Sequence, residues 1–257
     1  MNTALEDILA RHRLLARLLH ARTCPGQREK LWAGLGLDPS GHGLAVVFRE
    51  EVPAGNLARR IEDADRDAVA LAAGTRTFAV TPCGARLRRL AEKTPGLRAG
   101  IGNTVAVAEL HRSRNQALHA LAFTGYGGPV ARVISYEELG NLGALARLPR
   151  QELLGMADLA VITEMDADGN GRAALEALEA LCRTGTLRRA AKLLHLHHSS
   201  VAKRIGQVEE RLGRRLTEPI PLASAYASIL ALRLLTSADR DELPAPTAVL
   251  RPSLDKC

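Results

Sequence analysis

The apolar residues of this chain follow two different patterns before and after about residue 150. In the first part, short runs rich in Val, Ile or Phe alternate with segments in which apolar residues recur every three or four positions. The short runs predict strands and start at Gly43, Thr75, Leu97 and Val130. The other segments predict helices over residues 57–72, 85–93 and 108–123. Such alternation predicts a sheet covered by helices.

The later part of the chain is helical in pattern. One predicted helix places its apolar face on Leu187, Ala190, Ala191 and Leu194. A second uses Val201, Ile205, Val208 and Leu212, with Gly213 placed to end it. Only His195–His198 separate them, so the connection is a tight turn. We therefore predict an α+β protein, in which a mixed α/β domain is followed by an all-α helix-turn-helix domain.

The expected organisation has five parts. They are an amino-terminal helical segment over 1–40, the α/β domain over 41–150, a linker over 151–171, the helix-turn-helix domain over 172–237 and a flexible tail over 238–257. The amino-terminal segment is amphipathic, which fits packing on its own domain, packing on a partner chain or binding to a membrane surface. Glu6 and Asp7 disfavour the membrane surface.

The sequence predicts a cytoplasmic protein with no membrane partner. Arg or His recurs every few residues near the amino terminus, unlike a secretory signal. No run approaches the roughly 20 apolar residues that cross a bilayer. The four cysteines contain no CxxC pair, so no zinc site is predicted.

The net positive charge of the chain is confined to one stretch of the sequence. The 257 residues are 46% hydrophobic and 25% charged, a globular composition, and carry a formal charge of +7. Nine basic and two acidic residues lie between Arg183 and Arg215, so this stretch carries the whole excess. A basic run of this kind is either a solvated helix face or a surface for a polyanion. Only 3% of residues are aromatic, which disfavours RNA binding by base stacking.

The basic stretch coincides with the predicted helix-turn-helix, whose second helix enters the DNA major groove in proteins of this kind. We predict that bases are contacted by exposed residues at the front of that helix: His198, Ser199, Ser200, Lys203, Arg204 and Gln207. Ser199 or Ser200 is expected to cap it. Phosphates are expected to be contacted by Arg188, Arg189, Lys192 and His197. An ordinary helical hairpin would not require both outward faces to be basic.

Residues 172–235 resemble the carboxy-terminal helix-turn-helix of PucR/CdaR-type bacterial transcriptional regulators. The matching positions are Leu194, Leu196, His197, Val201, Arg204, Ile205, Leu212, Gly213 and the Ala231–Leu235 end. Departures at His198, Ser199, Ser200 and Ala202-Lys203 fall on the positions expected to read bases, so the resemblance implies the mode of binding and not the target. Part of the segment is also similar to the DNA-binding head of LysR-type regulators, which opens its chain in that family.

The middle of the chain is similar to the degenerate GGDEF domain of PucR/CdaR-type proteins. Gly100-Ile101-Gly102 is followed by Ser113, Ala117, Ala120 and Leu121 in a helical pattern, and Val133–Leu139 resembles the closing strand. The cyclase signature is missing, since Gly127-Gly128 is followed by Pro129. The resemblance therefore implies no enzyme activity and no cofactor.

Taken together, the residues and the resemblance favour a transcriptional regulator that binds double-stranded DNA. A single helix-turn-helix domain covers too little DNA surface for tight specific binding, so we expect a homodimer or higher oligomer. The α/β part is expected to mediate self-association or to respond to an unknown small-molecule effector. The alternative is a nucleotide or small-ligand receptor, or an enzyme, in the middle domain, with the basic helices binding a protein partner.

Two patterns resemble metal sites without completing one. The sequence MDADGNG starts like a calcium loop, but Ala177 occupies the twelfth position, where a Glu is needed. Asp168 and Asn170 are better explained as a turn and helix cap. His195, His197 and His198 have no Cys or carboxylate partner nearby in the sequence. We expect no metal.

Overall fold

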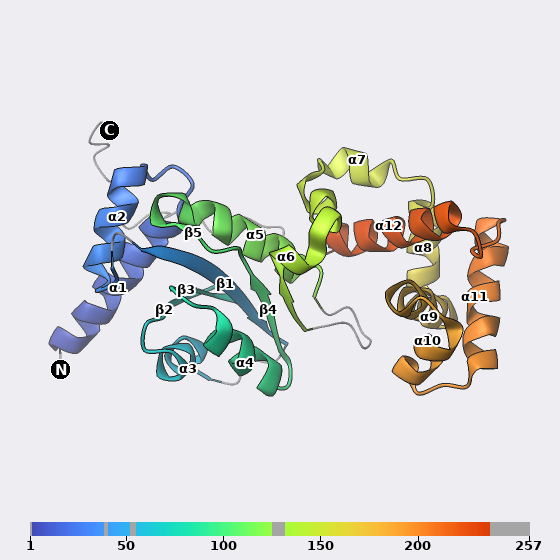
Figure 1. Ribbon diagram of the computed structural model, residues 1–257, viewed down its shortest axis with the longest axis horizontal. Coiled ribbons are helices and arrows are strands. Elements are labelled where there is room, and N and C mark those ends of the chain that lie inside the picture. Colours follow the sequence, from blue (N-terminus) through green and yellow to red (C-terminus); the bar gives the residue numbers. More distant parts are fainter. Residues whose placement is uncertain (1, 39–40, 52–54, 125–131, 237–257) are drawn as a thin grey trace. The chain divides into compact units, whose positions relative to one another are not determined.

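The computed structural model describes residues 2–38, 41–51, 55–124 and 132–236, with side chains from residue 9 onward (Figure 1). The described chain forms two compact units, one of residues 2–124 and 132–143 and one of residues 144–236. The expected tail over 238–257 and the Gly127-Gly128 pair lie outside the described residues, as does the start of the strand expected from Val130.

A six-stranded sheet forms the centre of the first unit. Its strands are β1 (His42–Glu50), β2 (Val69–Ala73), β3 (Arg76–Thr81), β4 (Leu97–Ile101), β5 (Val105–Ala106) and β6 (Val133–Ser135). The strand order is β2-β3-β1-β4-β6, and β5 pairs with β1. All neighbours are antiparallel except β4 and β6, which are parallel. The expected sheet is therefore present and has a mixed topology.

Helices cover both faces of this sheet. Side chains of the central strand β1 point alternately to the two faces, so each face has apolar residues to bury. Ala45 and Val47 face one cluster of buried residues, whereas Val46 and Phe48 face the other. The first cluster is completed by α1 (Asn2–Leu19), α2 (Pro25–Gly34) and α5 (Leu110–Ala122). The second is completed by α3 (Leu57–Ala64) and α4 (Ala85–Lys93) (Figure 1).

The amino-terminal helices belong to the first unit rather than to a separate segment. Leu15, Leu18 and Leu19 of α1 are fully buried, and Trp32 of α2 is 1% exposed against the same sheet. Burial of side chains this large supplies much of the apolar area on that face. Of the three interpretations of the amphipathic segment, packing on its own domain is the one that the structure shows.

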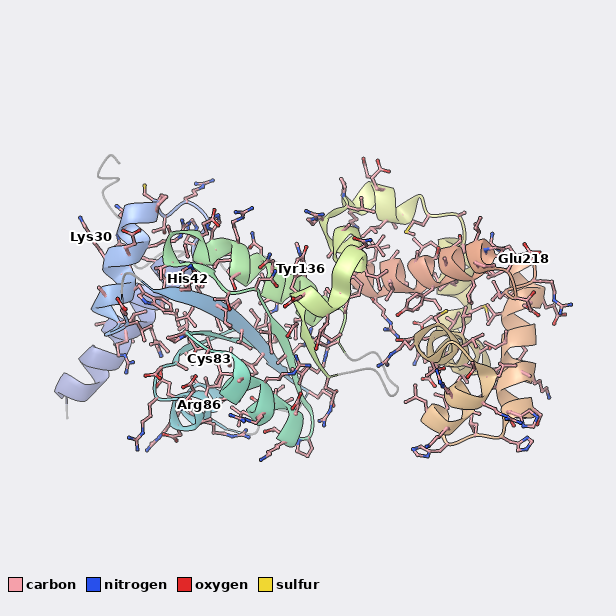
Figure 2. The ribbon with its side chains drawn as sticks, viewed as in Figure 1. Lys30, His42, Cys83, Arg86, Tyr136 and Glu218 are labelled. Atoms are coloured by element: carbon pink, nitrogen blue, oxygen red, sulfur yellow. The ribbon has the colours of Figure 1, made fainter. Side chains whose placement is uncertain are left out.

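One predicted helix is too long. The segment 57–72 was expected to be helical throughout, but α3 ends at Ala64 and Val69–Ala73 forms β2, paired with β3. The buried Asp65 accounts for the break: its carboxylate accepts a hydrogen bond from Thr81 Oγ1 at 2.8 Å and pairs with Arg86 at 2.9 Å (Figure 2 labels Arg86). Strand pairing then overrides the helical preference of the Ala-rich residues.

Strand β4 and helix α5 lie in very close contact. A Cβ on Gly100 would lie 2.0 Å from the Ala117 carbonyl oxygen, and one on Gly102 would lie 2.0 Å from the Ser113 carbonyl oxygen. The buried Ser113 also accepts a hydrogen bond through Oγ from the Ala45 N–H at 2.9 Å. The Gly-Ile-Gly sequence is thus required by the packing of a helix directly on strand backbone.

The second unit is helical. Its elements are α7 (Arg150–Leu154), α8 (Leu159–Ala167), α9 (Gly169–Thr184), α10 (Leu187–Leu194), α11 (His198–Leu212) and α12 (Pro219–Thr236). The segment expected as a linker carries α7 and α8, because Leu153, Leu159, Ile162 and Met165 are buried. Short helices α6 (Tyr136–Leu139) and η2 (Gly140–Arg147) precede them along the chain.

Helix α12 alone among the described helices is long and apolar enough to cross a membrane by length and composition. It packs against α7, α8 and α9, and Leu230, Ala231 and Leu234 are buried. Arg233 forms a buried ion pair with Glu179 of α9. These contacts are those of a core helix within this unit.

Candidate nucleic-acid interface

The first helix of the basic stretch is held at both ends by local hydrogen bonds. Thr186 caps α10, accepting the Arg189 N–H through its side chain at 3.3 Å. At the other end His195 adopts a left-handed backbone with φ 53°. This conformation lets the Leu196 N–H donate to the Ala191 carbonyl at 2.9 Å. The helix therefore stops sharply and the turn begins within one residue.

The second helix begins at His198 and is capped by His197, not by Ser199 or Ser200 as the sequence predicted. The Nδ1 atom of His197 accepts the Ser199 N–H at 3.4 Å and lies 2.8 Å from Ser199 Oγ. Nδ1 must be unprotonated to accept, so the cap places the ring proton on Nε2. As expected, α11 ends at Gly213, whose backbone is left-handed with φ 66°.

Small and branched apolar residues hold the two helices together. Ala190 and Val201 are fully buried and Ile205 is 8% exposed, with α9 packed against both helices. The paired alanines allow the close approach that a short turn demands. Leu187, expected on the same apolar face, is instead 38% exposed at the start of α10.

The predicted DNA-contacting residues lie on the outside of this helix pair. Nine of the ten are exposed: Arg188, Arg189, Lys192, His197, His198, Ser199, Ser200, Lys203 and Gln207. Arg204 is half-buried. The rings of His197 and His198 lie together, with centroids 4.2 Å apart. Gln207 lies further along α11, in the wall of a pocket.

Eight of the nine basic residues of the stretch, all except Arg183, divide into two groups. At its carboxyl end Arg211 pairs with Glu164 at 3.1 Å, Arg214 with Asp158, and Arg215 with Glu209 at 3.6 Å. The other group has no carboxylate partner among the described residues, and its members are Arg188, Arg189, Lys192, Lys203 and Arg204. The uncompensated charge is therefore concentrated on α10 and the first half of α11.

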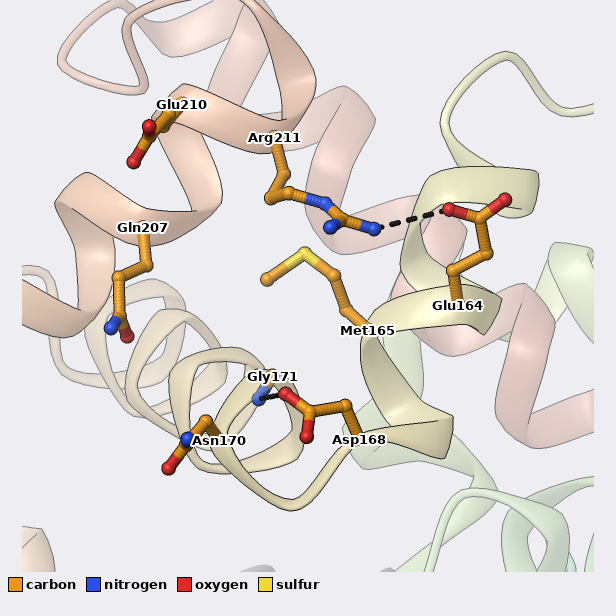
Figure 3. Close-up of a pocket in the computed structure, with 8 residues that line it drawn as sticks. All are labelled: Glu164, Met165, Asp168, Asn170, Gly171, Gln207, Glu210 and Arg211. Carbon is orange, nitrogen blue, oxygen red and sulfur yellow. Dashed lines mark hydrogen bonds and ion pairs between the residues drawn. The ribbon is translucent and has the colours of Figure 1, made fainter.

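A pocket of about 260 Å³ lies where α8, α9 and α11 meet (Figure 3). Asp168 at its edge accepts the Gly171 N–H at 2.9 Å and is the N-cap of α9. The turn-and-cap interpretation of MDADGNG is confirmed by this bond. Across the described part of the chain, no group of three or more His, Cys, Asp or Glu is placed to hold a metal.

One residue of the outer face of α11 was not singled out by the sequence analysis. Gly206 is exposed and lies beside Lys203 and Ala202 on the surface opposite the buried Val201, Ile205 and Val208. Glycine carries no hydrogen-bonding or charged side chain, so a search for base-contacting groups passes over it. Helical spacing from the buried residues was the available signal.

The first unit holds buried guanidinium groups of a structural kind. Arg28 is 2% exposed and donates to the carbonyls of Ala108 at 2.8 Å, His20 at 3.0 Å and Ala21 at 3.2 Å. Burial, and then the charges of Arg28, Arg114 and Arg112, lower the pKa of His111 beside them. The hydrogen bonds of Arg28 tie α2 to the residues that follow α1 and to the short helix η1 (Val107–Glu109) that precedes α5.

Comparison with known families agrees with both units. Residues 27–123 match the GGDEF-like domain, and residues 173–220 match the bacterial regulatory helix-turn-helix protein of the lysR family. The chain carries a GGDEF-like domain followed by a regulatory helix-turn-helix. The GGDEF-like match starts inside α2 and ends after α5, so it includes part of the segment expected to precede the domain. The helix-turn-helix match supports a DNA-binding regulator of transcription.

Comparison with individual proteins adds little. No curated protein matches the chain. Among solved structures, a regulator of polyketide synthase expression from Bifidobacterium adolescentis is 19% identical, over 85% of this chain and 96% of that chain. The TM-score of 0.30 is too low to relate the two arrangements in space.

Proposed function

We propose that this chain is a transcriptional regulator of the PucR/CdaR type that binds double-stranded DNA through α10 and α11. The observation that carries the proposal is a group of five cations on these helices that have no ion-pair partner among the described residues, within the segment that matches the regulatory helix-turn-helix. A surface that lacks internal counter-charges gains most from a polyanion. In this assignment α11 lies in the major groove and α10 faces the phosphates.

The two helices have different tasks in this proposal. Lys203 and Arg204 lie on the first half of α11, within reach of base edges, together with His198, Ser199 and Ser200. Arg188, Arg189 and Lys192 extend from α10 toward the backbone of the duplex, as does His197 from the turn. Gln207 is retained as a base contact at the far end of this face.

The first unit, which contains the GGDEF-like match and is called the GGDEF-like unit below, serves regulation rather than catalysis in this proposal. We assign it self-association or the response to a small effector, and we expect a homodimer or higher oligomer on a repeated or inverted site. Sedimentation of the full chain with and without duplex DNA tests the assembly. A monomer that binds DNA with full affinity would contradict it.

Binding of fluorescent duplex DNA to the full chain at two salt concentrations tests the main proposal. The wild type should bind, with an affinity that falls as salt rises. Arg188→Ala and Arg189→Ala should each weaken binding to all sequences and reduce the salt slope by about 1. Lys203→Ala with Arg204→Ala should lose sequence preference as well as affinity.

The matched control is Arg215→Ala, which removes a basic residue from the same stretch that already pairs with Glu209. Its effect on affinity should be small compared with that of Arg188→Ala. Absence of salt-sensitive binding by the wild type would reject DNA as the partner. It would favour the alternative in which the basic helices bind a protein.

A further inference from the structure

Gly206 occupies an unusual place in the middle of α11. It is exposed, seven residues before the helix ends at Gly213, and an added Cβ would meet nothing within 4 Å. Its backbone is not in the left-handed region, unlike that of Gly213. Neither a special conformation nor a crowding neighbour among the described residues therefore requires glycine here.

The helix itself would be better served by another residue. Glycine in a helix interior loses more conformational freedom on folding than alanine and destabilises the helix relative to it. Gly100 and Gly102 show the contrast, since both lie against helix backbone. A bare backbone segment that the fold does not use is available for close approach by a ligand.

The position on the helix points to which ligand approaches. Gly206 is three residues after Lys203 and four before Glu210, so the three positions are neighbours on one face. The positive charge of Lys203 favours the approach of polyanionic DNA, whereas the negative charge of the exposed Glu210 opposes it. The face that fits DNA therefore runs from the start of α11 to Gly206 and ends before Glu210.

We propose that Gly206 is the point of closest approach between α11 and the DNA duplex, where the wall of the groove packs on helix backbone. The proposal rests on the DNA-binding function proposed above and adds a positioning residue to it. Glycine sets the depth at which α11 enters the groove, and this depth brings Lys203 to its contact.

Gly206→Ala tests the proposal because it separates folding from binding. The added methyl group improves helix propensity, so Tm should rise by about 2 °C. It also occupies the space that the groove wall needs, so affinity for duplex DNA should fall about tenfold. Opposite changes in the two measurements are not expected of a merely structural position.

Gly206→Lys makes the test stricter, because it adds a positive charge at the same place. If Gly206 stayed exposed to solvent in the DNA complex, this variant should bind DNA equally well or more tightly. A position in close contact predicts weaker binding in spite of the charge. The matched control is Gly26→Ala in α2 of the GGDEF-like unit, which is also exposed, helical and without neighbours within 4 Å. It should leave DNA affinity unchanged.

The outcomes distinguish this inference from the function on which it rests. If the wild type binds DNA and both Gly206 variants bind within about twofold of it, the close approach is wrong while DNA binding stands. If the wild type does not bind DNA, the proposed function fails first. Weaker binding by both variants, with Gly26→Ala unchanged, supports the inference.

Discussion

Single atoms decide the packing of the GGDEF-like unit at Gly100 and Gly102. At both positions the nearest obstacle to a Cβ is a carbonyl oxygen of α5, at 2.0 Å. Backbone atoms of a helix cannot rotate away as the end of a side chain can. The contact therefore tolerates no side chain without moving α5 from the sheet.

Gly100→Ala should lower the free energy of unfolding by about 3 kcal/mol, because α5 must shift to relieve the overlap. Urea unfolding followed by circular dichroism would measure the change. Gly26→Ala, with open space around it, serves as the control and should be neutral or slightly stabilising. Equal stabilities of the two variants would show that α5 is not held against β4.

His111 should make stability depend on pH. Burial and the charges of Arg28, Arg114 and Arg112 lower its pKa below the usual 6.5. His111 is therefore protonated at a lower pH in the folded protein than in the unfolded chain. The stabilisation is present above pH 6.5 and is lost as pH falls through the lowered pKa. His111→Gln should flatten the fall in Tm between about pH 7.5 and pH 5.5. An unchanged pH profile in the variant would assign the dependence to other groups.

At the scale of elements, the start of α11 depends on one imidazole. His197→Ala removes the acceptor for the Ser199 N–H and should destabilise the second unit by about 1 kcal/mol. His197→Asn retains a capping side chain and should restore most of that stability. Thermal unfolding measures both variants.

DNA binding separates the two roles given to His197. If it also contacts phosphate, His197→Asn should bind DNA more weakly than the wild type although its fold is restored. Equal affinities would leave His197 as a cap alone.

Helices α10 and α11 could be predicted from the sequence because their signals are local. The apolar spacing and Gly213 marked both ends of the pair to within one residue. The strands β1, β3 and β4 were predicted from short runs rich in Val, Ile or Phe, and the helix α4 from apolar residues that recur every three or four positions. Exposure of the predicted contacts followed from helical geometry.

The errors arose where distant residues decide the outcome. β2 is a strand because β3 lies beside it, and α3 stops because Asp65 is bound by Thr81 and Arg86. The helices α7 and α8 replaced an expected linker through contacts with α12. The division of the charge into paired and unpaired groups also depended on carboxylates, such as Glu164 and Asp158, from outside the basic stretch.

At the scale of the whole molecule, the location of charge should matter more than its sum. Neutralising Arg188, Arg189, Lys192, Lys203 and Arg204 to Gln lowers the formal charge from +7 to +2. We expect DNA binding to be lost, because these five cations of the helix-turn-helix have no ion-pair partner in the part of the chain that the structure describes.

The matched variant neutralises five exposed basic residues of the GGDEF-like unit, which are Lys30, Arg59, Arg66, Arg89 and Lys93. It reaches the same formal charge and should retain most of the affinity of the wild type. Titration of labelled duplex with the two variants at one salt concentration provides the comparison. Equal losses would mean that net charge alone attracts DNA.

The pairing of Arg211, Arg214 and Arg215 within their own unit has a kinetic consequence. The cations left for DNA pair with no carboxylate of the described residues, so an approaching duplex displaces water and small ions from them. Complex formation then needs no exchange of ion-pair partners, so its rate is limited by the diffusional encounter of protein and DNA. The association rate should be fast and should slow with added salt, because the field that guides the duplex is screened.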